Sequence, residues 1–235
     1  MPIFPRSTQS SEGCVAAALV AIALLLGAAG SRAQQTAANP NGMSWGELSL
    51  LPEYCRDVQG IIYGDASFNT SPRAGKWVSS MGQDFWHMHH YCYALLSMNR
   101  AKSAGATQPQ RTALWLKAEG DYNYVLRNCR PTMPLIPEVL VRLGELHLEM
   151  GKLGDAYSDF ARAREIKPDY WPAYSRWVDV LMRSGKRSGA RELAELGLAR
   201  APDSDMLKQQ VKSLGGDPAR IVAAARARAA SEATQ

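Results

Sequence analysis

Apolar residues recur at spacings of three and four along much of the chain after residue 80, which is the period of a helix with one buried face. The stretch 61–76 is instead rich in Gly, Ser, Asn and Asp and is expected to form an extended loop. The expected fold class is therefore all-α. Besides the region 137–203, helices are expected over 49–59, from about 81 or 84 to 102, over 111–128 and 204–214, and from Pro218 to about 230.

Between Pro137 and Asp203 one pattern occurs twice, at a period of 34 residues. Small residues within it would let two helices approach closely, and a proline would end the second helix of each unit. The first copy contains Leu140, Leu143, Gly144, His147, Ala156, Phe160 and Pro168, and the second contains Tyr174, Trp177, Val178, Leu181, Ala190, Ala194 and Pro202.

In period, residue pattern and helix–turn–helix layout these two copies resemble the tetratricopeptide repeat (TPR). The resemblance implies an α-solenoid of TPR-type helix hairpins with an irregular N-terminal segment. Expected boundaries are 1–33 for a signal peptide, 34–80 for the irregular segment, 81–134 for a degenerate TPR-like helix pair, 137–170 and 171–204 for two TPR units, and 205–235 for C-terminal capping helices.

The apolar run from Cys14 to Gly30, followed by Ser31-Arg32-Ala33, predicts a secretory signal peptide. An uncleaved membrane anchor is the alternative. No second long apolar stretch follows, so no membrane span is expected once the leader is removed. The expected location is the periplasm or the outside of the cell, with or without association with the envelope.

Net charge adds little to this picture. The chain carries +5, and residues outside 1–33 carry +4, which is 25 basic minus 21 acidic side chains. This surplus is spread along the sequence, whereas nucleic-acid binding needs a concentrated basic face. Nucleic acid is therefore not an expected partner.

Three cysteines lie beyond the leader, at Cys55, Cys92 and Cys129. Disulfides persist in exported proteins, and an odd number allows at most one bridge within the chain. Cys55–Cys92 is the preferred pair, because it would tie the N-terminal segment to the first long helix. Cys92–Cys129 is the alternative.

A cluster of metal-ligating residue types lies at His87, His89, His90 and Cys92. Imidazole and thiolate suit zinc, copper or haem iron. On a helix, however, His87 and His89 point about 200° apart, so the four side chains cannot converge on one ion. We therefore expect no cofactor and keep a metal- or haem-handling exported protein as the alternative function.

The resemblance also implies a binding surface, because in TPR arrays the first helix of each unit lines a concave groove that takes a peptide. No convincing catalytic motif is present, so the expected protein is a non-enzymatic adaptor or scaffold with a protein or peptide partner. The charges in this groove differ from the Lys/Asn set of chaperone-type TPR domains. The expected groove residues are Trp86, His90, Tyr93, Arg142, Glu145, Glu149, Arg176, Asp179 and Arg183.

Overall fold

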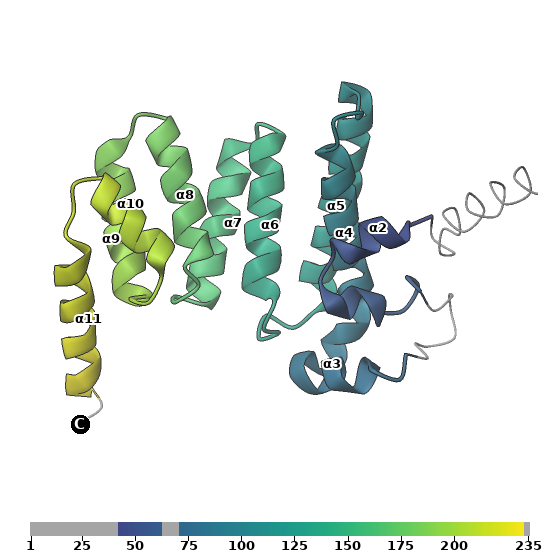
Figure 1. The fold of residues 1–235 in the computed structure, drawn as a ribbon, viewed down its shortest axis with the longest axis horizontal. Coiled ribbons are helices and arrows are strands. Elements are labelled where there is room, and N and C mark those ends of the chain that lie inside the picture. Colours follow the sequence, from purple (N-terminus) through teal and green to yellow (C-terminus); the bar gives the residue numbers. More distant parts are fainter. Residues whose placement is uncertain (1–41, 63–70, 233–235) are drawn as a thin grey trace, which may run out of the picture.

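The computed structural model describes residues 42–62 and 71–232, so the predicted signal peptide at 1–33 lies outside the described residues. Every regular element within those ranges is a helix, which confirms the all-α fold class (Figure 1). None of the described helices is long and apolar enough to cross a membrane. The elements in chain order are α2 (Trp45–Ser49), η1 (Glu53–Arg56), α3 (Ala74–Met81), η2 (Gly82–His87), α4 (Met88–Ala101), α5 (Gln108–Asn128), α6 (Ile136–Glu149), α7 (Leu153–Ile166), α8 (Pro172–Arg183), α9 (Arg187–Arg200), α10 (Asp205–Ser213) and α11 (Pro218–Glu232).

Helix hairpins stand side by side along the molecule (Figure 1). Helix α4 packs against α5, α6 against α7, and α8 against α9, and the successive pairs meet through α5–α6, α7–α8 and α6–α8 contacts. This arrangement confirms the predicted α-solenoid. The helices α4, α6 and α8 are the first members of their pairs, so their exposed faces form one side of the array.

The repeated residues form the contacts within each hairpin. Gly144 of α6 faces the ring of Phe160 on α7, and an added Cβ atom would lie 3.0 Å from that ring. The first helices of the two regular repeats, α6 and α8, are each followed by a glycine with positive φ, Gly151 at 74° and Gly185 at 72°, a conformation that other residues rarely adopt. The two hairpins, whose matching positions are 34 residues apart, are therefore built in the same way.

The N-terminal segment differs from its prediction. The expected helix over 49–59 is instead α2 and the short 3₁₀ helix η1. Ser44 begins α2 early, because its side chain accepts a hydrogen bond from the Glu47 amide while Glu47 bonds back to the Ser44 amide. Pro52, which lacks an N–H, separates the two elements.

The first long helix is also shorter than predicted. Regular structure begins at Ala74, within the expected loop 61–76, and α3 ends at Gly82, whose φ is 73°. The chain then follows the 3₁₀ helix η2 as far as His87 before α4 starts. A 3₁₀ helix has about three residues per turn and not 3.6, so it shifts the rotation of every residue that follows.

The N-terminal arm, residues 42–62, is fastened to α4. Cys55 and Cys92 form a disulfide with an S–S distance of 2.01 Å, which confirms the preferred pairing. The Arg100 guanidinium donates to Glu47 at 2.6 Å, and the Tyr93 hydroxyl donates to the Gly60 carbonyl at 2.7 Å. The irregular arm therefore covers the outer end of the solenoid.

The last two helices differ in how deeply they pack. In α10, Leu207 and Val211 are fully buried against Tyr174, Val178 and their neighbours. Helix α11 lies along α9 and contains no buried residue. The main cover of the last hairpin is therefore α10.

Candidate partner-binding groove

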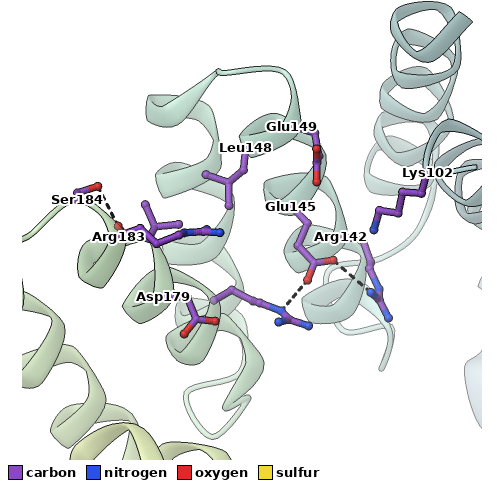
Figure 2. Close-up of a pocket in the computed structure, with 10 residues that line it drawn as sticks. Lys102, Arg142, Glu145, Leu148, Glu149, Asp179, Arg183 and Ser184 are labelled. Atoms are coloured by element: carbon purple, nitrogen blue, oxygen red, sulfur yellow. Dashed lines mark hydrogen bonds and ion pairs between the residues drawn. The ribbon is translucent and has the colours of Figure 1, made fainter. Parts of the chain in front are cut away.

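A recess of about 610 Å³ opens on the side of the array formed by α4, α6 and α8 (Figure 2). Six of the nine predicted groove residues line it together. Its lining consists of Lys102, Arg142, Glu145, Leu148, Glu149, Arg176, Asp179, Val180, Arg183 and Ser184.

One ion pair in this recess joins two first helices, and a second extends it along α6. Glu145 of α6 accepts from Arg176 of α8 at 2.6 Å and from Arg142 on its own helix at 3.2 Å. Residues 142, 145 and 149 recur at spacings of three and four, which places them on one face of α6. The helical period thus turns separate sequence positions into one continuous charged surface.

Arg142 has the most charged surroundings of the recess. Burial by itself lowers the pKa of its guanidinium, but the charge of Glu145, together with Tyr91 and Glu138, more than offsets this and the pKa is raised. The Tyr91 hydroxyl donates to Glu138 at 2.8 Å, next to Arg142. Arg142 therefore stays positively charged at any physiological pH.

Asp179 is held by the helix that covers the last hairpin. The Gln210 side-chain amide of α10 donates to the Asp179 carboxylate at 2.7 Å and to the Ser175 carbonyl at 3.2 Å. Because an amide carries no charge, this contact orients Asp179 without neutralising it. The oriented carboxylate lines the recess.

Two smaller recesses continue from the first, and both include Arg142. One, of about 230 Å³, lies toward the N-terminal ends of α6 and α8 and is lined in part by Trp171 and Met206. The other, of about 320 Å³, lies between α6 and the N-terminal arm and is lined in part by Leu50 and Leu95. We call these three connected recesses the groove.

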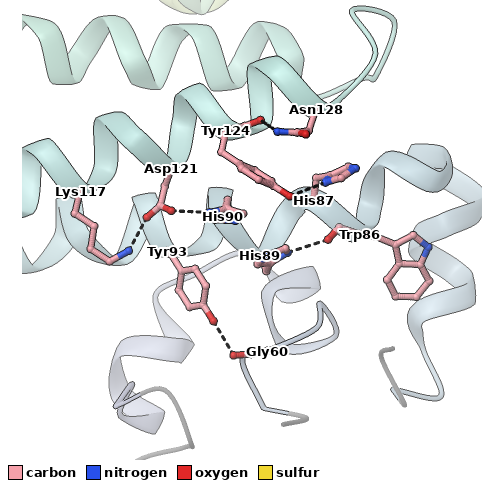
Figure 3. Close-up of polar contacts among 10 residues, drawn as sticks. All are labelled: Gly60, Trp86, His87, His89, His90, Tyr93, Lys117, Asp121, Tyr124 and Asn128. Atoms are coloured by element: carbon pink, nitrogen blue, oxygen red, sulfur yellow. Dashed lines mark hydrogen bonds and ion pairs between the residues drawn. The ribbon is translucent and has the colours of Figure 1, made fainter. Parts of the chain in front are cut away.

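Three predicted groove residues lie elsewhere, so this part of the prediction is corrected (Figure 3). His90 pairs with Asp121 of α5 at 2.6 Å, Tyr93 binds the N-terminal arm, and the Trp86 indole donates to Gln83 at 3.0 Å. None of the three lines a recess of the groove.

The physical reason is rotation about the helix axis. Leu95 and Asn99 of α4 and Lys102, which follows its end, line the groove, and these positions lie at spacings of four and three. Moving by one residue turns a helix face by about 100°. The disulfide at Cys92 and the contact of His90 with Asp121 of α5 hold α4 in this rotation, and neither constraint is visible in hydrophobic periodicity.

The four proposed metal ligands do not form one site, although the rings of His89 and His90 have centroids 4.4 Å apart. Cys92 is in the disulfide, His87 lies 3.3 Å from the Tyr124 hydroxyl, and His89 contacts the Trp86 carbonyl at 2.8 Å (Figure 3). Burial, and next the charge of His90, lower the pKa of His89. In the part of the chain that the structure describes, no group of three or more His, Cys, Asp or Glu side chains could hold a metal ion.

The histidines instead pack against α5. The His90 and Tyr124 rings have centroids 3.7 Å apart, and Asp121 accepts from both His90 and Lys117. Burial raises the pKa of Asp121, but these two hydrogen bonds outweigh it, and the pKa is lowered. This cluster joins the two helices of the degenerate unit.

His147, which occupies a slot where the TPR pattern prefers tyrosine, is also structural. Its side chain is buried between two carboxylates, Asp159 of α7 at 2.6 Å and Glu119 of α5 at 3.1 Å. Lys152 binds the same Glu119 at 2.6 Å. This polar network links the degenerate unit to the first regular repeat on the side away from the groove.

The stacked hairpins and their charged inner face define an α-solenoid with a candidate peptide-binding groove. Residues 137–211 match the family model described as tetratricopeptide repeat. No curated protein and no solved structure matches the chain. The repeat suggests protein–protein interaction and is typically a non-enzymatic module.

Proposed function

We propose that this protein is a non-enzymatic adaptor or scaffold of the periplasm or cell envelope that holds a partner protein or peptide in its groove. The observation that carries the proposal is the convergence of Arg142, Glu145 and Glu149 on α6 with Arg176 and Arg183 on α8 in one open recess. Charged side chains that line an open concavity can recognise a partner without unfolding any part of the array.

Export rests on the sequence of the leader and on one supporting observation. The Cys55–Cys92 disulfide suits an oxidising compartment, because thiols are kept reduced in the cytosol. Fractionation of cells that express the full chain, with mass determination of the mature N-terminus, tests this part. Recovery of the intact chain in the cytosol with free thiols at both positions would refute export.

Partner binding is tested by crosslinking in the native envelope. A photo-crosslinking amino acid at Ser184, in the recess, should capture a partner, and the same group at the exposed Ser158 of α7 should not. The captured protein is then identified by mass spectrometry. Equal capture from the two positions would refute the groove as the binding surface.

Charge reversal provides a second test of partner binding. Arg176→Glu and Arg183→Glu should each weaken capture, because they reverse charges inside the recess. Arg162→Glu, at an exposed position of α7, is the matched control. Undiminished capture by both groove variants would count against the proposal.

A further inference from the structure

The two edges of the groove differ in chemistry. The edge at the C-terminal ends of the first helices carries Lys102 after α4, Glu149 at the end of α6 and Arg183 at the end of α8 (Figure 2). All three side chains are exposed, and neither Lys102 nor Arg183 forms an ion pair with any described residue. This edge therefore offers two available cations with one anion between them.

The opposite edge, at the N-terminal ends of α6 and α8, is apolar and aromatic. Trp171 is 40% exposed and Met206 is 44% exposed, although both are large apolar side chains. Both line the smaller recess that shares Arg142, Glu145 and Arg176 with the main one. The Arg142–Glu145–Arg176 ion pairs separate the two edges.

From this arrangement we infer that the groove takes an extended segment of the partner in which charged and large apolar residues alternate. This inference rests on the proposed function and deepens it. Successive side chains of an extended chain point to opposite sides, so one edge of the segment faces Lys102 and Arg183 while the other faces Trp171 and Met206. Charge complementarity assigns acidic residues to the two cations and a basic residue to Glu149 between them.

The same charges allow a purely structural explanation. Cations at helix C-terminal ends interact favourably with the helix dipole, and Lys102 and Arg183 both occupy such ends. Lys167 after α7 and Arg200 at the end of α9 occupy equivalent places outside the groove, are also exposed, and form no ion pair with a described residue. This second pair makes a matched control, because any dipole effect is shared.

Three synthetic peptides serve as probes, each flanked by Gly-Ser and carrying a fluorophore. The first has the core Asp-Leu-Lys-Leu-Asp, the second the charge-swapped core Lys-Leu-Asp-Leu-Lys, and the third the core Asp-Ser-Lys-Ser-Asp. Fluorescence anisotropy at low salt should show the first binding about tenfold more tightly than either of the others, since exposed charges are screened less at low ionic strength. Equal binding of the first two peptides, or binding of none, would overturn the inference.

Variants then assign each edge. The double variant Lys102→Glu with Arg183→Glu should bind the first peptide about tenfold more weakly and the charge-swapped peptide more tightly, because both cations become anions. Lys167→Glu with Arg200→Glu should change neither affinity by more than about twofold, since exposed charges away from a contact contribute little. Trp171→Ala with Met206→Ala should weaken the leucine peptide and leave the serine peptide unchanged.

Circular dichroism and thermal melting confirm that each variant is folded, and the milder pair Lys102→Gln with Arg183→Gln replaces any reversal that is not. If the groove double variant and the control double variant lose similar affinity for the first peptide, dipole compensation is the only role of these cations and the inference is overturned. Crosslinking at Ser184 is independent of this result. A partner captured there whose bound segment lacks the alternation would refute the inference and leave the proposed function standing.

Discussion

At the scale of single residues, glycines decide how closely the helices of one hairpin approach. Gly197 of α9 packs on Tyr174 of α8, and an added Cβ atom would lie 2.7 Å from the Tyr174 ring. Real Cβ atoms do not come this close to another side chain, so either the helix or the tyrosine must move. Both residues belong to the core of the last hairpin.

We predict that Gly197→Ala lowers the free energy of unfolding by about 1–3 kcal/mol, because the core of this hairpin is overpacked. Gly120, in the middle of α5, is the matched control, since an added Cβ atom there meets nothing within 4 Å. Gly120→Ala should stabilise the protein by about 0.5–1 kcal/mol through helix propensity alone. Urea denaturation of both variants measures the difference, and two changes of the same sign would contradict the packing argument.

Glu47 provides a prediction about pH. A hydrogen bond from Arg100, with further bonds from Ser44, lowers the pKa of this carboxyl from 4.5 to about 2 despite the opposing effect of burial. A lowered pKa in the folded state stabilises the fold above pH 4.5, and this contribution is lost as the pH falls from 4.5 toward about 2. The N-terminal arm should therefore loosen at acid pH.

The measurement is the difference in Tm between the unmodified protein and Glu47→Gln as a function of pH. It should be largest above pH 4.5 and shrink toward zero near pH 2. Arg100→Gln should remove the same pH-dependent part, because it takes away the other partner of the ion pair. A difference that stays constant across this range would show that Glu47 does not titrate with folding.

At the scale of elements, the arm of residues 42–62 depends on its covalent link to α4. Cys55 and Cys92 are both fully buried, and their sequence separation is 37 residues. Replacing both by alanine should lower the free energy of unfolding by about 2–4 kcal/mol, mainly because the unfolded chain regains freedom. Guanidinium denaturation tests this.

Cys129→Ala is the control, because it leaves the disulfide intact. Cys129 is buried, and burial raises its pKa to about 12, so it behaves as a small apolar side chain. Its replacement should cost clearly less than loss of the bridge. Equal losses from the two changes would mean that packing, and not the crosslink, holds the arm.

At the scale of the whole molecule, the last helices contribute unequally to the array. A chain that stops after Gly216 loses α11, which has no buried residue, and should still unfold in a single transition. A chain that stops after Asp203 also loses Leu207 and Val211, which are fully buried. The longer deletion should cost about 3–6 kcal/mol more, as expected for two fully buried side chains.

Thermal melts followed by circular dichroism compare the two truncations. The shorter one should change Tm by only a few degrees, whereas the longer one should broaden or split the transition as the α8–α9 core opens. Equal effects would show that α11, and not α10, covers the end of the array.

The sequence by itself determined the repeating part of the protein. The positions that pair within a hairpin, such as Gly144 with Phe160, recur every 34 residues, and glycine and proline mark the ends of the helices. The repeated pattern and its resemblance to the TPR were therefore sufficient to predict the solenoid and the groove residues of α6 and α8. The sequence favoured the Cys55–Cys92 disulfide, because it ties the N-terminal segment to the first long helix, but left Cys92–Cys129 as an alternative that the structure excludes.

Only the tertiary structure decided which face of α4 lines the groove. It also decided which residues outside the first helices line the groove. The docked arm and the contacts with α5 hold α4 in one rotation, so Lys102 lines the groove while His90 packs against α5. Trp171 lies in the turn before α8, and Met206 lies in α10. The two side chains therefore meet only when neighbouring repeats stack. A periodic pattern specifies a face within one helix, but the angle between helices depends on contacts that are remote in sequence.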